Sequence, residues 1–116
     1  MNSFPSDECV IVVCNAPDAE TAGRIAEALV GERLAACVNI LAPCRSVYLW
    51  QGAVERSEEV PLLIKTRRDA YPRLEARLQA LHPYEVPEIV AWPLVMGLPS
   101  YLTWVSDSVV SSGEAG

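Results

Sequence analysis

The 116-residue sequence is short of positive charge, with nine Lys and Arg residues against fifteen Asp and Glu residues and a formal net charge of -6. A nucleic-acid-binding protein needs concentrated cations to displace counterions from phosphate, so this composition argues against DNA or RNA as a partner. An acidic membrane surface would repel the chain for the same reason. The sequence also has no apolar run near the roughly 20 residues that a membrane helix needs. We therefore expect neither a nucleic acid nor a membrane as partner.

The motifs that carry common enzyme chemistry are absent as well. The sequence contains no GxSxG, no Walker loop, no GxGxxG and no HExxH. Its single histidine, His82, cannot supply a histidine-rich metal site within one chain. Because no nucleophile–base pair is evident, we expect a protein without catalytic activity.

Cysteine is sparse and dispersed, and the four cysteines form neither a CxxC pair nor a dense disulfide framework. Such usage is typical of a reduced, cytoplasmic protein. Residues 1–8 have no cationic flank and no apolar segment of signal-peptide length, which also favours a cytoplasmic location. We expect these residues to form an N-terminal tail and residues 111–116 a disordered C-terminal tail, around a single domain over residues 9–110.

What the sequence has in excess is apolar residues, which make up 51% of it. A chain of this length has a high ratio of surface to volume and buries only roughly two-thirds of its unfolded surface on folding. The excess therefore indicates that part of the apolar surface is buried against another subunit.

An apolar strand followed by an amphipathic helix is predicted near the N-terminus. The β-branched run over residues 10–14 is apolar on both faces, as in a central strand that is covered on both sides. Asp18 is placed to cap the next helix, whose apolar residues recur at helical spacing over residues 22–30. Gly31 stands where a left-handed residue ends such a helix.

The middle of the chain predicts a long β-hairpin. Alternating apolar residues give one arm over residues 35–50, a turn at 51–52 and a second arm over residues 60–66. Pro43 and Pro61 have no N–H for the ladder, so each marks an edge or a bulge. A ribbon with arms this long is only marginally stable alone. We expect another copy of the chain to cover its free edges.

A second helix and a further strand complete the pattern. Asp69 is placed to cap a helix whose leucines recur at helical spacing, and Pro83 stops that helix after His82. Residues 88–96 return to strand, with Pro93 at an edge or a bulge, and a short terminal helix follows. This order places both main helices on one face of a four-stranded antiparallel sheet, which is an α+β fold of the ferredoxin-like split βαβ type.

Cys14 and His82 are candidate functional residues with open alternatives. Cys14 ends the first strand, where a strand edge meets solvent, but a free cysteine is also often a small buried hydrophobe. Cys9 lies on the opposite face of that strand, so the two thiols do not share one ion. His82 ends a helix, where it bonds nearby carbonyls, binds a metal or joins Glu85 in acid–base chemistry.

Three further residues are candidates for a ligand site. Lys65 lies inside an apolar strand, where it either blunts an edge against aggregation or pairs with Glu59 or Glu88 in a cleft. Trp50 and Tyr84 either line a pocket or pack in the core. Each alternative makes a different prediction for where these side chains lie.

Five segments together resemble the CutA divalent-cation-tolerance family. In chain order they are residues 14–18, 34–39, 48–52, 64–67 and 82–89. The resemblance covers about residues 9–109. The His-Pro-Tyr-x-x-Pro-Glu segment, the Trp-x-Gly turn and the Lys-Thr pair are specific in combination.

The resemblance implies a ferredoxin-like subunit that assembles as a homotrimer, with the long hairpins paired between subunits. It also implies a role in tolerance of copper and other divalent cations, with copper bound by some members. Carried over by position, the proposed copper ligands fall on Cys14, Leu81 and His82. Leucine has no donor atom, so the site is reduced to a thiolate and an imidazole. Cu(I) tolerates two ligands, and weak copper binding is therefore the expectation.

The family resemblance also implies a lateral cleft between subunits. The residues at its family-typical positions are Trp50, Glu59, Lys65, Tyr84, Pro87 and Glu88. Charges of both signs beside aromatic rings suit a small polar anion or an amphipathic ligand.

The sequence therefore leads to three functional hypotheses. The first is a non-enzymatic trimer that responds to metal ions, with Cys14 and His82 as residual copper ligands. The second is a signal or ligand-sensing trimer that is similar to the PII proteins and uses the cleft between subunits. The third is a structural scaffold for partner proteins.

Overall fold

The computed structural model describes residues 8–110, so the predicted tails at 1–8 and 111–116 lie outside the described residues except for Glu8. In chain order the elements are β1 (Cys9–Ala16), α1 (Ala19–Gly31), β2 (Cys37–Ile40), β3 (Cys44–Trp50), β4 (Ala53–Arg67), the short 3-10 helix η1 (Arg68–Ala70), α2 (Tyr71–Leu81), β5 (Ile89–Pro93) and α3 (Pro99–Ser108). None of the helices in this range has the length and apolar character that crossing a membrane requires.

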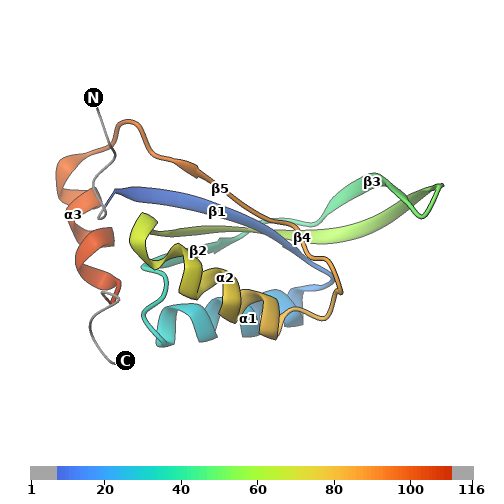
Figure 1. Ribbon diagram of the computed structural model, residues 1–116, viewed down its shortest axis with the longest axis horizontal. Coiled ribbons are helices and arrows are strands. Elements are labelled where there is room, and N and C mark those ends of the chain that lie inside the picture. The colour runs from blue at the N-terminus through green and yellow to red at the C-terminus, as the bar shows by residue number, and fades with distance from the viewer. Residues whose placement is uncertain (1–7, 111–116) are drawn as a thin grey trace.

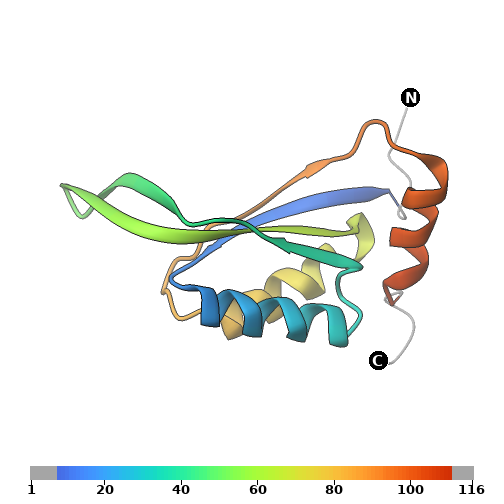
Figure 2. The same ribbon diagram turned by 180° about the vertical axis from the view of Figure 1, so that it is seen from behind.

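The strands form one antiparallel sheet in the order β2-β4-β1-β5, and β3 continues the ladder along the far half of β4. α1 and α2 lie side by side under one face of the sheet, while α3 packs at the end away from the hairpin (Figure 1). Figure 2 shows the same two layers from behind, with both main helices on one side of the strands. This is the split βαβ arrangement that the sequence predicts, with one strand more because the first hairpin arm is divided.

Pro43 lies where the first hairpin arm divides into β2 and β3. Pairing of β2 with β4 ends at Ile40, which lies opposite Leu62. Pairing of β3 with β4 begins at Cys44, which lies opposite Glu59. Three residues of the first arm therefore face two residues of β4. This extra residue is the bulge predicted at Pro43, and a bulge bends the strand that contains it.

The core is formed by the side chains that β1 and β4 direct toward α1 and α2. Alternate positions on the strands meet the apolar stripe of each helix, as the sequence periodicities predict. The large side chains that are fully buried there are Val12, Leu62, Ile64, Ile25, Leu29, Leu74 and Leu78.

The opposite face of the sheet is only half covered within this chain. Ile11 and Val13 of β1 are half-buried there, whereas the alternate residues of the strand are buried against the helices. On the neighbouring strand β5, Val90 is 50% exposed and Trp92 is 48% exposed. The prediction that β1 is covered on both faces therefore holds on one face only. The other face leaves apolar surface for a partner.

The two ends of α1 are set by different residues. Asp18 caps the helix as predicted, because its carboxylate accepts a hydrogen bond from the Thr21 N–H at 2.7 Å. Gly31 is not left-handed, and that prediction is wrong. The positive φ of 60° falls on Arg33, two residues beyond the end of the helix. Its guanidinium donates to two carbonyls at the end of α3, and these bonds hold the turn in place.

Asp69 does not cap α2, which begins after Ala70 without a side-chain cap. The Asp69 carboxylate instead accepts two hydrogen bonds from the Arg67 guanidinium, at 2.9 and 2.8 Å. Arg67 also donates to the carbonyls of Ser106 and Val109. The bonds to these carbonyls tie the end of β4 to the end of α3. The bidentate pair occupies the Asp69 carboxylate, which is therefore not available to cap α2.

β5 is shorter than predicted, because it ends at Pro93 rather than at residue 96. Among the described strands it pairs only with β1, so it is an edge strand. The edge position predicted for Pro93 is confirmed. The Leu94 N–H still donates to the Cys9 carbonyl at 3.0 Å, and beyond that bond the chain leaves the sheet.

We predict that Arg67→Ala lowers the free energy of unfolding by about 3 kcal/mol, because it leaves a largely buried carboxylate without its partner. The Arg67 side chain is 9% exposed and that of Asp69 24%. Urea denaturation followed by circular dichroism measures the change. The control is Arg77→Ala, which removes an ion pair with Glu32 whose side chains are 41% and 42% exposed, and it should lower stability far less. Equal losses in the two variants would contradict the role of Arg67.

Candidate functional site

The end of β1 and the loop after α2 meet at one corner of the molecule. His82 Nε2 lies 2.7 Å from the main-chain carbonyl oxygen of Asn15, and because a carbonyl only accepts, Nε2 carries the proton. The Tyr84 N–H donates to the other ring nitrogen, Nδ1, at 3.1 Å. The Tyr84 ring also lies against the imidazole, with centroids 4.7 Å apart. These contacts fix the loop to the end of the sheet.

Cys14 precedes this carbonyl in β1 and faces the core, where it is fully buried. Its Sγ has a weak contact of 3.9 Å with the carbonyl oxygen of Asn15. Burial, together with the charges of Glu88 and Glu59, raises the pKa of the Cys14 thiol to about 12. The residue therefore stays protonated and behaves as a small buried hydrophobe.

This corner does not fit a preformed copper site. Metal binding needs a thiolate and a ring nitrogen with a free lone pair. Here the Cys14 thiol keeps its proton, and both nitrogens of His82 are used by hydrogen bonds. Leu81 packs against the core and has no donor atom. Within residues 8–110, no three His, Cys, Asp or Glu side chains come together as a set of metal ligands.

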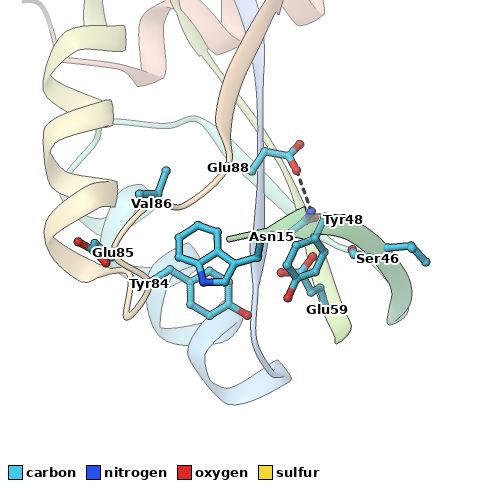
Figure 3. Close-up of a pocket in the computed structure, with 10 residues that line it drawn as sticks. Asn15, Ser46, Tyr48, Glu59, Tyr84, Glu85, Val86 and Glu88 are labelled. Carbon is cyan, nitrogen blue, oxygen red and sulfur yellow. Dashed lines mark hydrogen bonds between the residues drawn. The ribbon is translucent and has the colours of Figure 1, made fainter. Parts of the chain in front are cut away.

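A cavity of about 630 Å³ lies beside this corner (Figure 3). It is bounded by the end of β1, the hairpin strands β3 and β4, and the loop between α2 and β5, which are far apart in the sequence. Its lining residues are Asn15, Ser46, Val47, Tyr48, Trp50, Glu59, Tyr84, Glu85, Val86 and Glu88.

This cavity is lined by four of the six residues that were predicted to line a cleft between subunits. Lys65 and Pro87 do not line the cavity. Lys65 Nζ donates instead to Asn39 Oδ1 on the neighbouring strand β2, and it pairs with neither Glu59 nor Glu88. The charged side chains that residues 8–110 of one chain contribute to this lining are all carboxylates, whereas the mixture of charges was predicted for a cleft between two subunits. The four predicted residues that line the cavity are Trp50, Glu59, Tyr84 and Glu88.

Sequence reasoning missed several of the lining residues. Asn15 was given no role, yet its Nδ2 donates to Glu88 Oε1 at 3.1 Å and holds that carboxylate beside β1. Ser46 and Tyr48 precede Trp50 by four and two residues on the same strand. Successive side chains of a strand alternate between faces, so the choice of Trp50 already indicated these two.

Glu59 is the buried charge of the cavity, with 8% of its surface exposed. Within residues 8–110, no Lys, Arg or His forms an ion pair with it. Burial raises the pKa of the Tyr84 phenol, and the negative charge of the nearby Glu59 raises that pKa further. Tyr84 is therefore a neutral phenol beside the Glu59 carboxylate.

The split βαβ topology and the projecting hairpin define a small ferredoxin-like protein that has a ligand-sized cavity. A family model described as CutA1 divalent ion tolerance protein matches residues 10–108. The chain belongs to this family. The CutA family is non-enzymatic, in agreement with the expectation from the sequence.

Relatives with known names match along most of the chain. The divalent-cation tolerance protein CutA of Thermus thermophilus is 50% identical over 98 residues, which cover 84% of this chain and 95% of the relative. The protein of the same name in Pectobacterium atrosepticum is 39% identical over 109 residues, which cover 94% and 99%. The crystal structure of CutA1 from Oryza sativa has a TM-score of 0.89 at 37% identity and covers 92% of this chain and 98% of that one.

We predict that iodoacetamide labels Cys14 about a thousandfold more slowly in the native protein than in urea, because the thiolate is the reacting species. The pKa near 12 and the full burial of Cys14 both disappear on unfolding. Mass spectrometry of the labelled peptides measures the two rates. Cys44, which is half-buried on β3, provides an internal comparison within the same sample. Native labelling of Cys14 as fast as in urea would contradict its protonated, buried state.

Proposed function

We propose that the protein takes part in the cytoplasmic response to metal ions as a non-catalytic homotrimer. The names of its relatives support the metal-ion role, since they are called divalent-cation tolerance proteins. Cys14, Cys37 and Cys44 carry free thiols, which suits the reducing cytoplasm. A CutA protein of Archaeoglobus fulgidus is named periplasmic, so members of the family differ in location.

The projecting hairpin is the observation that carries the trimer. β3 and the outer half of β4 extend beyond the helices (Figure 1). Apolar side chains on this ribbon are largely exposed, with Val47 at 61%, Leu49 at 71% and Val54 at 60%. A two-stranded ribbon is only marginally stable in water, so copies of the same chain that pair with its edges would stabilise it. Three is the number of copies that the family resemblance implies.

We predict that sedimentation equilibrium at micromolar concentration gives three times the 12.7 kDa mass of the chain. Leu49→Asp should shift the distribution to smaller species, because it places a charge on the face that the neighbouring copy covers. Leu49→Ile keeps the apolar surface and should leave the trimer intact. A wild-type chain that sediments as a monomer at this concentration would contradict the proposal.

In this proposal, Cys14 and His82 bind copper only with low affinity. A copper ion would have to displace the thiol proton and at least one of the two hydrogen bonds of the imidazole. It would also find only two protein ligands, because Leu81 stands where the family resemblance implies a histidine. The metal-ion role that we propose therefore does not depend on a preformed copper site.

We predict that Leu81→His raises the affinity for Cu(I) by at least about tenfold over the wild-type chain, because it restores a third donor. Competition with a Cu(I) chelator measures the affinity of each variant. Cys14→Ser should remove the weak binding that the wild type retains. If Leu81→His binds Cu(I) no more tightly than the wild type, this corner does not form the copper site that the resemblance implies.

A second function, the sensing of a small ligand, is favoured by the cavity with its buried, unpaired carboxylate. The cavity walls include both the hairpin and the loop that follows α2. The hairpin is also the surface that we propose to pair between copies. A ligand that contacts this wall would therefore act directly on the trimer interface.

A further inference from the structure

The charge of the side chains that line the cavity determines which sign of charge a ligand can carry. Glu59, Glu85 and Glu88 line it, and no Lys, Arg or His in the described part of the chain does. One of these carboxylates has a neutral donor, since Asn15 Nδ2 donates to Glu88 Oε1. A neutral donor orients a carboxylate without cancelling its charge. An anion would therefore be repelled by this lining, whereas a cation complements it.

Glu59 marks the place where the positive group of a ligand would lie. It is more than nine-tenths buried, it lines the cavity, and within residues 8–110 no side chain forms an ion pair with it. A buried carboxylate without a counter-charge is costly, because it has lost most of its hydration. A ligand cation next to Glu59 would supply the charge that the chain does not.

Aromatic rings make the cavity suited to an organic cation. Tyr48 and Trp50 come from β3 and Tyr84 from the loop after α2, so the rings approach from two sides. Figure 3 shows the Tyr84 and Tyr48 rings among the side chains that line the cavity. The face of an aromatic ring attracts an ammonium group, and Trp attracts it most strongly.

The size of the cavity and the arrangement of its donors argue against a bare metal ion. A divalent metal needs several donor atoms that converge on one point, and the acidic residues between 8 and 110 form no such cluster. The volume of about 630 Å³ falls instead within the range of pockets for small organic molecules, about 300–1,000 Å³.

We propose that the cavity binds an organic cation that carries an ammonium group, with the positive nitrogen beside Glu59 and its carbon substituents against Tyr48, Trp50 and Tyr84. The inference rests on the ligand-sensing function proposed above and names the chemical class of its ligand. Glu85 and Glu88 add negative potential that attracts the ligand.

Isothermal titration calorimetry on the full-length protein in its native assembly tests this binding. The probes are choline, which carries a quaternary ammonium group, and spermidine, which carries primary and secondary ammonium groups. Dimethylbutanol is the uncharged isostere of choline. At least one of the two cations should bind with saturation, and dimethylbutanol should not. Citrate is the anionic probe, and Zn²⁺ alone tests the metal alternative.

Three variants locate the site. Glu59→Gln keeps the shape of the side chain and should weaken cation binding by at least about tenfold, because it removes the buried charge. Glu58→Gln makes the same change at the adjacent, exposed position of β4, outside the cavity, and should leave the affinity unchanged. Trp50→Leu, with the carboxylates intact, should also weaken binding if an aromatic face contacts the cation. Circular dichroism checks that each variant folds.

The outcomes separate this inference from the function on which it rests. Binding of citrate in place of the cations overturns the ligand class but keeps the sensing function. Binding of Zn²⁺ that depends on Glu59, without binding of either amine, also overturns it and favours a metal. Cation binding that is unchanged in Glu59→Gln overturns the placement, and equal binding of dimethylbutanol overturns the role of charge. If no probe binds, both the inference and the sensing function fail.

Discussion

One continuous strand, the 15-residue β4, determines how the rest of the molecule is arranged. Its inner half lies in the sheet between β1 and β2, where Leu62 and Ile64 are fully buried. Its outer half pairs only with β3 and is largely exposed. The change of environment falls near Glu59, opposite the bulge that separates β2 from β3. Because the strand is unbroken there, whatever packs on the hairpin also sets the position of one wall of the cavity.

The acidic cavity and a reactive thiol at Cys14 exclude each other. Glu59 and Glu88 line the cavity and also add to the effect of burial in raising the pKa of this thiol. A thiolate would need the opposite surroundings, with a positive neighbour or solvent. The hydrogen bonds of His82 also argue against a metal site. They occupy both ring nitrogens and hold the loop that carries Tyr84. The corner is therefore built to hold the cavity walls in place rather than to present soft metal ligands.

Local patterns predicted the elements correctly, whereas contacts between distant segments decided the exceptions. The 3.6-residue and two-residue periods located the helices and most of the strands, and Asp18 capped α1 because its partner is three residues away. Asp69 failed as a cap because Arg67, tied to the carbonyls of α3, competes for its carboxylate. Within one chain, Lys65 lies outside the cavity because it donates to Asn39 across the ladder. Four segments line the cavity, and no local pattern predicts how such segments meet. Four of its residues were among those that the family resemblance implied.

The central claim of this account is that other copies of the chain cover the hairpin. Hydrogen–deuterium exchange, resolved by peptide, tests it most directly, because exchange reports how often a backbone hydrogen bond opens. The account predicts that the amides of β3 and of the outer half of β4 exchange as slowly as those of β1 in the native protein at micromolar concentration. Hairpin amides that exchange as rapidly as those of an unfolded peptide, while β1 stays protected, would contradict it.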